Sequence, residues 1–409
     1  MQKRRLKAFC FEPFLIFQEV IMEHVKLFEA IKNSAVDIFS EQGLLKRLAG
    51  GKSLKIKFGA DPSRPDLHLG HSVVLRILRK LQDAGHEIIF VIGDFTGMIG
   101  DPSGRNKARI PLTLEETRQN GQSYFEQVTK ILDPAKARIT YNSEWLGKMD
   151  FSAALKLAGK YTLARILERD DFAKRFANKQ PIGLHELFYP LMQGYDSIAL
   201  HADIEVGGTD QTFNLLVARE LQKDYGQTPQ EVITFPLLPG LDGIEKMSKS
   251  LDNYIGIDEP PGIIFEKCMK IPDSVIADYF RLTTDIPESE YGPLLDSDIR
   301  RAHLVYAREI VRLYHGEGAI GEAEKRYESI ASGIAPDVMS AITIRGGEIS
   351  VVELLKRVGF ASSNSDARRL IAGGGIKLDG EKISDTDLVV RRDAVLSRGK
   401  NRFVQVRFS

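Results

Sequence analysis

Two short stretches carry side chains whose types and spacing could handle a phosphorylated substrate. The first contains His68, Gly70 and His71, between an apolar run at 54–58 and an apolar helical pattern at 73–81. This order predicts a strand, a loop and a helix, with the histidine pair at the start of the helix. Unpaired N–H groups and the helix dipole favour anions there. Imidazoles can hydrogen-bond phosphate oxygens, and a glycine lets a flat ring lie against the backbone.

The second stretch, Lys246 to Ser250, reads Lys-Met-Ser-Lys-Ser and puts two ammonium groups and two hydroxyls on one short segment. Lysines in loops are usually just solvated, and the histidine motif alone is a weak signal. The two motifs together, in this order and about 180 residues apart, are a much stronger one. In this combination the chain resembles the class I aminoacyl-tRNA synthetases.

The resemblance implies that an amino-acid carboxylate attacks the α-phosphate of ATP, that pyrophosphate leaves, and that tRNA then receives the amino acid. Such chemistry needs no protein nucleophile, because positioning and stabilisation of charge on the phosphates suffice. Mg²⁺ usually shares that task. The catalytic residues implied are His68, His71, Lys246, Lys249 and Ser250. Further ATP contacts are implied for Asp61, Gly70, Gly208 and Asp210.

Selection of the amino acid should rest on buried polar groups. Tyr189, Gln193 and Asp196 fall on one face of a helix expected at 185–199. A carboxylate can accept a hydrogen bond from a phenol, and Gln and Tyr can hold an α-ammonium group. An ordinary core helix explains the apolar residues between them but leaves these three without partners. The pattern is similar to that of tyrosyl-tRNA synthetases, which implies further tyrosine contacts from Thr96, Asp101 and Gln211.

One position departs from that family pattern. Many members carry a tyrosine four residues before the aspartate of the first loop, where it contacts the substrate hydroxyl, and this chain has Lys57 there. Which group besides Asp196 meets the phenol therefore stays open. Arg105 and Arg109 match basic residues of a loop that helps to hold pyrophosphate, with two surface arginines as the alternative. Trp145, the only tryptophan, is interpreted as a packing residue.

Alternating strands and helices must position these groups. The continuous apolar run at 87–92 is typical of a buried parallel strand, and short strands are expected at 204–206 and 232–238. Thr113 and Glu116 form a capping box that opens the helix after them. The alternation predicts an α/β fold with a Rossmann-like parallel sheet, whose ligands gather at the carboxyl ends of the strands.

At 409 residues the chain is too long for one ordinary core. The segment 332–348 contains Gly333, Pro336, Gly346 and Gly347, a composition typical of a linker between domains. The expected parts are a catalytic domain at 25–254, a helical anticodon-side domain at 255–331, a linker at 332–348 and a C-terminal α+β RNA-binding domain at 349–409.

The last sixty residues read as a separate module. Ser350 and Ser363 are expected to cap two helices, and Asp379-Gly380 is expected to turn a hairpin. From Ser350 onward there are 12 Lys and Arg against 7 Asp and Glu, and a basic tail indicates a nucleic-acid contact. The module resembles the small RNA-binding domain that ends tyrosyl-tRNA synthetases of bacterial type. tRNA contacts are expected from Arg368, Arg369 and Lys377.

Bulk composition excludes several classes of protein. Lys and Arg balance Asp and Glu at 56 each, which excludes a polybasic protein. Cys10 and Cys268 lie far apart without metal-ligand spacing, so neither a disulfide framework nor a protein metal site is expected, and the cytoplasm is the simplest location. No apolar run approaches the length of a membrane span.

The N-terminus imitates a signal peptide, because Lys3, Arg4 and Arg5 precede an apolar segment. Glu12 and Pro13 interrupt that segment, and no small-residue cleavage site follows. Residues 1–24 are therefore expected to be an unstructured extension, with Met22 as the natural start.

The resemblance thus implies a tyrosine–tRNA ligase. It also implies a homodimer, because family members are homodimers, and helices within 113–178 are expected to supply much of the interface. A tryptophanyl-tRNA synthetase would share both motifs, but Gln193 with Asp196 on one helix and the RNA-binding tail argue against it. A catalytically idle RNA-binding protein would not need the intact lysines and histidines. A small nucleotidyltransferase can share the histidine motif, but not the lysine motif in this form or the tail.

Overall fold

The computed structural model describes residues 12–60, 67–101, 113–332, 339–399 and 402–409. These residues form two compact units. The first comprises the described residues up to Asp258 together with Ile271–Ala302, and the second comprises Glu259–Lys270 together with His303–Ser409. The helical domain expected at 255–331 is therefore shared between the two units.

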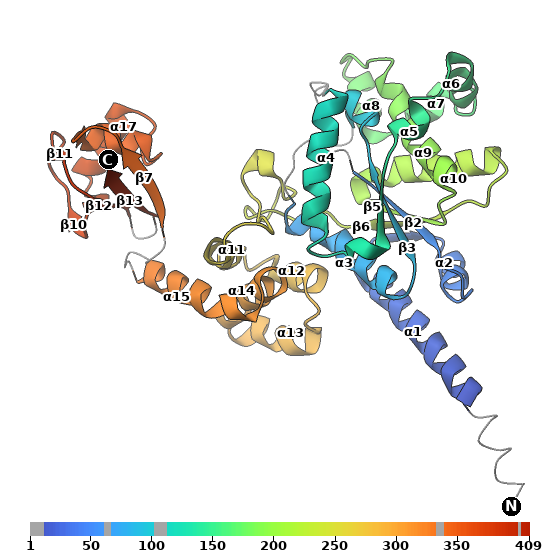
Figure 1. The fold of residues 1–409 in the computed structure, drawn as a ribbon, viewed down its shortest axis with the longest axis horizontal. Coiled ribbons are helices and arrows are strands. Elements are labelled where there is room, and N and C mark those ends of the chain that lie inside the picture. The colour runs from blue at the N-terminus through green and yellow to red at the C-terminus, as the bar shows by residue number, and fades with distance from the viewer. Residues whose placement is uncertain (1–11, 61–66, 102–112, 333–338, 400–401) are drawn as a thin grey trace, which may run out of the picture. The chain divides into compact units, whose positions relative to one another are not determined.

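A six-stranded sheet forms the centre of the first unit (Figure 1). All neighbouring strands are parallel except the first, which runs antiparallel to its neighbour at one edge. This confirms the predicted Rossmann-like α/β fold. In spatial order the strands are β1 (Asp37–Phe39), β6 (Glu231–Phe235), β5 (Ile204–Gly208), β2 (Lys55–Ala60), β3 (Glu87–Ile92) and β4 (Ala137–Tyr141).

The order of the strands creates a switch point at the centre of the sheet. From β2 the chain moves outward through β3 and β4, whereas from β5 it moves the other way to β6. In open α/β sheets a ligand binds where the order reverses, outside the carboxyl ends of the strands. The expected site is therefore the crevice between the ends of β2 and β5.

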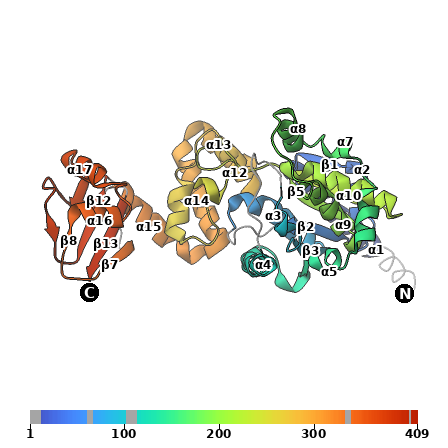
Figure 2. The ribbon, with the colours of Figure 1, turned by 90° about the horizontal axis from the view of Figure 1, so that it is seen from above.

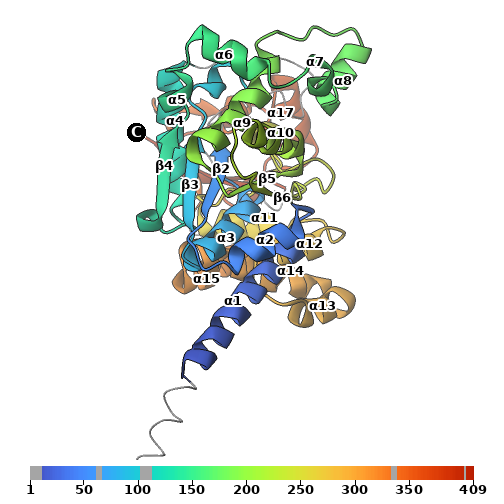
Figure 3. The same ribbon diagram turned by 90° about the vertical axis from the view of Figure 1, so that its right-hand side faces the viewer.

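Helices cover both faces of this sheet (Figure 3). On one face the rings of Phe90 and Tyr124 lie 5.6 Å apart, and on the other Ile89 and Val91 pack with Leu200. The helices of the unit are α1 (Glu12–Ser34), α2 (Glu41–Leu48), α3 (Leu69–Asp83), α4 (Leu114–Val128), α5 (Ser143–Leu146), α6 (Phe151–Ala158), α7 (Leu163–Ile166), α8 (Asp170–Ala177), α9 (Tyr189–Leu200), α10 (Thr212–Asp224), α12 (Ile276–Thr283) and α13 (Glu288–Ser297).

Ion pairs and a hydrogen bond join α12 and the turn after it to the unit that contains the six-stranded sheet. Asp285 accepts from Lys80 of α3 at 2.9 Å and also pairs with Arg76 of the same helix. The hydroxyl of Tyr279 donates to the carbonyl of Pro239 at 2.6 Å. These contacts explain why 271–302 belongs to the first unit.

Two local predictions in this unit have clear outcomes. The capping box is confirmed, because the Thr113 N–H donates to Glu116 at 2.8 Å and the Glu116 N–H donates to the Thr113 hydroxyl at 3.2 Å. The unstructured extension at 1–24 is wrong from Glu12 onward, since α1 spans Glu12–Ser34. The segment contains no glycine, and Pro13 falls in the first turn, where a missing N–H removes no helical bond. Residues 1–11 lie outside the described residues.

The second unit ends in a five-stranded sheet with two helices (Figure 2). Its spatial order is β10 (Glu381–Lys382), β9 (Ile376–Leu378), β12 (Ala394–Arg398), β13 (Arg402–Phe408) and β7 (Ser340–Ile344). A separate pair is formed by β8 (Ile349–Ser350) and β11 (Val389–Val390). The helices of the unit are α11 (Pro261–Cys268), the greater part of α14 (Ile299–His315), α15 (Ile320–Ala331), α16 (Val351–Arg357) and α17 (Asn364–Ala372).

The turn and cap chemistry of this tail is as predicted. The Ser350 and Ser363 hydroxyls accept from backbone N–H groups three residues ahead, at 3.3 and 3.1 Å. Asp379 and Gly380 both have positive φ, 50° and 86°, as a two-residue hairpin turn requires.

The linker predicted at 332–348 is partly wrong. β7 lies within it and pairs in parallel with β13, from Ser340↔Val404 to Ile344↔Phe408. Ile344 is 1% exposed and belongs to the core of the tail, so apolar burial outweighs the glycines that follow it. Residues 333–338 lie outside the described residues. Within the parts of the chain that are described, no helix is long and apolar enough to cross a membrane.

Candidate active site

The histidine motif lies at the start of α3, as predicted. His68 is the residue before the helix, its main-chain N–H donates to Nδ1 of His71 at 3.3 Å, and the two rings are 4.0 Å apart. Burial, the neighbouring His71 and the charge of Lys246 lower the pKa of His68 to about 2. Burial and the charge of Lys246 lower the pKa of His71 to about 4, against the effect of its hydrogen bond. Both imidazoles are therefore neutral at pH 7.

The lysine motif lies directly against the histidine motif, although they are far apart in sequence. The Leu69 N–H donates to the carbonyl of Ile255 at 3.0 Å, and His68 forms a bridge with Gly256. A Cβ on Gly70 would lie 3.0 Å from the His68 ring and 3.7 Å from Met247. The glycine therefore sits where the two motifs meet.

Each lysine of the motif has a partner in the crevice. Nζ of Lys246 lies 3.1 Å from Oδ2 of Asp210, which follows β5. Nζ of Lys249 lies 5.3 Å from the centroid of the Tyr254 ring. The Ser250 hydroxyl, on the exposed side of the turn, is 2.8 Å from that of Ser248. The Lys246 ammonium thus lies beside Asp210, just after β5, and the Lys249 ammonium lies against Tyr254.

Gly208, at the end of β5, leaves room that a larger residue would fill. A Cβ there would come within 2.7 Å of Oδ1 of Asp210 and 2.9 Å of Leu237. Real Cβ atoms are not found that close to other atoms, so the missing side chain at Gly208 lets Asp210 and Leu237 pack close to the backbone there.

A second polar cluster joins residues from four segments. Gln211 donates to Asp101 at 2.7 Å, and the Asn214 amide donates to Gln193 at 2.8 Å and to Gln211 at 3.2 Å. Arg169 reaches the other oxygen of Asp101 at 3.3 Å. The sequence predicted Asp101, Gln193 and Gln211 but missed Arg169, the residue before α8, and Asn214 of α10. Asn214, three residues after Gln211 on one helix face, offered a local signal; Arg169 offered none.

Asp196 is the centre of a third group of hydrogen bonds. It is 4% exposed, and it accepts from the indole N–H of Trp145 at 2.7 Å and from the Asn142 amide at 3.4 Å. The same amide donates to the Thr96 hydroxyl at 3.0 Å. Burial raises the pKa of Asp196 to about 7, against the charge of Lys57 and the two hydrogen bonds. Tyr189, 5% exposed, lies two turns earlier on the same helix.

Trp145 packs against Ile89, Val91 and Leu200, as interpreted. Its hydrogen bond to Asp196 and that of Asn142 were not predicted. Trp145 and Asn142 both lie just beyond the carboxyl end of β4, the edge where ligand-binding side chains collect. Asp94, at the end of β3, holds this turn by accepting from the N–H and hydroxyl of Ser143 at 2.9 and 2.6 Å. The sequence signal that could have identified Asn142 and Trp145 was their position just after a predicted parallel strand.

Lys57, where the chain departs from the family pattern, is fully buried. Its ammonium lies 2.8 Å from the carbonyl of Gln193, 2.9 Å from the hydroxyl of Ser197 and 2.8 Å from Oε1 of Glu205. The side chain therefore ends beneath α9, between the helix and the sheet.

Other expected site residues lie elsewhere. Asp61, Arg105 and Arg109 are outside the described residues. Arg368 and Arg369 are exposed on α17, where Arg369 pairs with Asp366 at 2.7 Å, and Lys377 is half-buried on β9.

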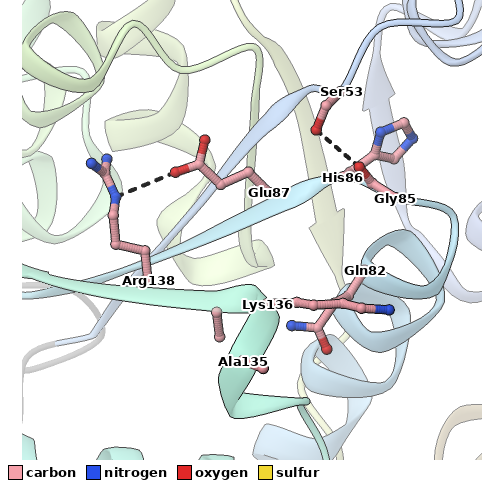
Figure 4. A pocket seen from close by; sticks show the side chains of 9 residues that line it. Ser53, Gln82, Gly85, His86, Glu87, Ala135, Lys136 and Arg138 are labelled. Atoms are coloured by element: carbon pink, nitrogen blue, oxygen red, sulfur yellow. Dashed lines mark hydrogen bonds and ion pairs between the residues drawn. The ribbon is translucent and has the colours of Figure 1, made fainter.

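A surface pocket of about 470 Å³ lies at the opposite edge of the sheet (Figure 4). Ser53, Gly85 and Glu87 line it near the amino ends of β2 and β3, and Arg138 of β4 pairs across it with Glu87 at 3.3 Å. None of the predicted site residues lines this pocket.

Sequence comparisons cover nearly the whole chain. The family described as "tRNA synthetases class I (W and Y)" matches residues 49–331. The "Tyrosine--tRNA ligase SYY-like C-terminal domain" matches residues 330–407. The tyrosine–tRNA ligase of Deinococcus radiodurans is 48% identical over 391 residues, 92% of this chain and 95% of the relative. That of Geobacter sulfurreducens is 49% identical over 394 residues, covering 93% and 98%.

Solved structures agree on the fold. A tyrosyl-tRNA synthetase from Archaeoglobus fulgidus, solved in complex with L-tyrosine, has a TM-score of 0.58 at 25% identity and covers 74% of this chain and 99% of its own. A C-terminally truncated mitochondrial tyrosyl-tRNA synthetase from Aspergillus nidulans has a TM-score of 0.63 at 20% identity, covering 77% and 99%.

Proposed function

The chain belongs to the class I tRNA synthetases for tryptophan and tyrosine and acts as a tyrosine–tRNA ligase, and we propose that the groups described above divide its first reaction between them. In that reaction a carboxylate oxygen of tyrosine attacks the α-phosphorus of ATP. Tyrosyl-adenylate forms and pyrophosphate leaves. The tyrosyl group then passes to the 3′-terminal adenosine of tRNA.

Neutral histidines and mobile lysines suit the triphosphate. Nδ1 of His68 is buried without a hydrogen-bond partner among the described residues, which supports a role as a donor to a phosphate oxygen. His71 accepts at Nδ1 from the backbone, so its Nε2 carries the proton. Lys246 and Lys249 supply positive charge. Its stabilising effect is greatest in the transition state, where negative charge grows on the leaving pyrophosphate. Ser250 completes this side of the proposed site.

The adenosine is assigned to the crevice between β2 and β5. Asp61, Gly70, Gly208 and Asp210 are its proposed contacts. The position of Asp210 supports this assignment, because it lies against Gly208 at the end of β5 and beside a lysine of the motif. Arg105 and Arg109 are proposed to hold pyrophosphate from outside the described residues.

The tyrosine is assigned to the side chains of α9 and the polar groups that contact them. Asp101, already held by Gln211 and Arg169, would accept from the α-ammonium group together with Tyr189 and Gln193. Asp196 would accept from the phenol hydroxyl. Thr96 is linked to Asp196 by the Asn142 amide, which donates to both. The single observation that carries this assignment is a buried carboxylate held by two ordered donors, because its remaining lone pairs can accept from a phenol hydroxyl.

Mg²⁺ is proposed to accompany ATP. Among the described residues, no three His, Cys, Asp or Glu side chains gather into a group that could hold a metal ion. The ligands would therefore be triphosphate oxygens, which Mg²⁺ prefers, and its charge would offset that of the phosphates.

A homodimer is proposed through the segment that follows α5. Phe151, Leu155, Leu163 and Phe176 are between 55% and 79% exposed there. An exposed group of large apolar side chains supports a protein–protein contact. Phe151→Asp should shift the protein from dimer to monomer in light scattering. A monomeric wild type at micromolar concentration would contradict the proposal.

tRNA is proposed to contact the tail through Arg368, Arg369 and Lys377. The Arg369 side chain is 82% exposed, which supports a role in phosphate contact. A cytoplasmic location is also proposed, supported by the bacterial tyrosine–tRNA ligases among its relatives.

The experiment that tests the proposed function is amino-acid-dependent exchange of pyrophosphate into ATP, run in parallel with each of the twenty amino acids. Exchange with tyrosine alone is expected. Exchange with tryptophan would overturn the role of Asp196, and no exchange in folded protein would favour an idle RNA-binding protein.

A further inference from the structure

Lys57 is a buried charge in the middle of the sheet. Its side chain is 0% exposed, and its neighbour in register on β5 is Glu205, whose side chain is 1% exposed. The two strands meet at the switch point, directly beneath the proposed site. The Nζ–Oε1 distance of 2.8 Å makes this a close ion pair between the two central strands.

The ammonium also binds the helix above the sheet. It donates to the main-chain carbonyl of Gln193 and to the hydroxyl of Ser197, which lie one turn apart on α9. Ser197 in turn donates to Oε2 of Glu205 at 3.0 Å. Three elements, β2, β5 and α9, therefore share one network, and α9 carries Tyr189, Gln193 and Asp196.

Such an arrangement is not explained by stability alone. Removing two charges from water is costly, and apolar residues of similar volume often hold a core equally well. We therefore expect this buried ion pair to have a role in function. The charged groups that face Asp196 are Lys57 from β2 and Glu205 from β5, and its hydrogen-bond donors are Trp145 and Asn142.

We propose that Lys57 is a positioning residue for tyrosine selection, which fixes α9 on β2 and β5 and so holds Asp196 in place, with a positive charge that favours the carboxylate form of Asp196. The inference rests on the proposed function, because it takes Asp196 as the group that accepts from the substrate phenol. Lys57 acts through α9 and Asp196 and has no contact with substrate of its own.

The charge of Lys57 is the largest influence that opposes the effect of burial on Asp196. Without it the carboxyl should hold its proton to higher pH. A protonated carboxyl accepts less strongly from a phenol than a carboxylate does. Loss of Lys57 should therefore raise the tyrosine KM most at neutral pH and least at alkaline pH.

The experiment uses the full-length enzyme and two variants. Lys57→Met removes the charge, and the double variant Lys57→Met/Glu205→Gln avoids leaving an unpaired buried carboxylate, so one folded variant is available if the single one fails. Trp145 is the only tryptophan and is bonded to Asp196, so its fluorescence against pH reports the charge of that carboxyl. The tyrosine and ATP KM values are measured over the same pH range.

In Lys57→Met, the midpoints of the fluorescence and tyrosine-KM profiles should both move up by about one pH unit, equal to about tenfold in KM below the midpoint. In the double variant the upward shift should be smaller, because the charge of Glu205, which raises the pKa of Asp196, is removed as well. The ATP KM should change less than about twofold. Lys55→Met is the matched control, because Lys55 lies on the same face of β2 but bonds to the Leu200 carbonyl at 3.3 Å. Its profiles should match the wild type.

Two results would overturn the inference. One leaves the proposed role of Asp196 intact, and the other overturns that role as well. If Asp196→Asn abolishes the wild-type profile but the Lys57 variants keep it, only the inference fails. If Asp196→Asn leaves the wild-type tyrosine-KM profile intact, the proposed role of Asp196 fails, and the inference fails with it.

Discussion

The indole N–H of Trp145 lies 2.7 Å from Oδ1 of Asp196 and donates to it. The two residues come from α5 and α9, two helices that are far apart in the sequence. Because the bond is to a buried carboxylate, it fixes the direction in which the remaining lone pairs point.

Trp145→Phe removes this donor while keeping an aromatic ring. Loss of the donor that orients Asp196 should raise the tyrosine KM. A hydrogen bond to a charged group contributes about 1.5–3 kcal/mol, so a rise of about tenfold or slightly more is the upper limit expected. The ATP KM, measured in the same exchange assay, serves as the internal control. A tyrosine KM within twofold of wild type would remove Trp145 from the account.

The pH dependence of tyrosine binding follows from the raised pKa of Asp196, about 7 against an ordinary 3.8. Tyrosine KM should fall as pH rises from 6 to 8, because ionisation creates the stronger acceptor. Asp196→Asn should flatten this dependence. A wild-type KM that is constant over this range would contradict the assignment.

The same pKa has a consequence for stability with the opposite sign. The folded state binds the Asp196 proton more tightly than the unfolded state, so this contribution is fully present below about pH 4 and is lost as pH rises through about 7. Denaturant unfolding of wild type and Asp196→Asn at the two ends of that window measures it. The difference in free energy of unfolding between the two proteins should shift in favour of the variant at the higher pH.

Lys249→Ala should slow tyrosyl-adenylate formation by about a hundredfold, because its charge matters most as negative charge develops on the phosphates. Tyrosine affinity in the absence of ATP should stay near wild type. Rapid mixing and equilibrium dialysis give the two values. Lys223→Ala, at an exposed lysine on α10, is the matched control. A large loss of tyrosine binding in Lys249→Ala would contradict the assigned role.

Truncation after Ser332 should spare adenylate formation and impair tRNA charging. The cut belongs before β7, because that strand pairs with β13 of the tail. The salt dependence of tRNA binding should weaken as cationic contacts are lost. Arg368→Ala/Arg369→Ala in the full chain tests the same contacts without removing the sheet. Equal charging by all three proteins would make the tail dispensable.

Local patterns gave the most reliable predictions. The histidine motif at a helix start, the capping box at Thr113 and the hairpin at Asp379 each depend on a few adjacent residues. Their geometry follows from backbone chemistry that the sequence displays directly. The parallel sheet could be predicted for the same reason, since buried strands read as continuous apolar runs.

Contacts between distant segments could not be predicted in this way. Trp145 and Asp196 are 51 residues apart, and Arg169 and Asp101 are 68 apart. Nothing in the local sequence marks Lys57 as buried, because its partners come from β5 and α9. These pairings exist only once the sheet order is set.

The most direct test of the account is the ratio of kcat/KM for tyrosine and phenylalanine in the exchange reaction, compared between wild type and Asp196→Asn. A buried acceptor left unpaired by phenylalanine rejects it, so the ratio should fall by about a hundredfold in the variant. An unchanged ratio in a folded Asp196→Asn protein would contradict the claim that this carboxylate selects the substrate.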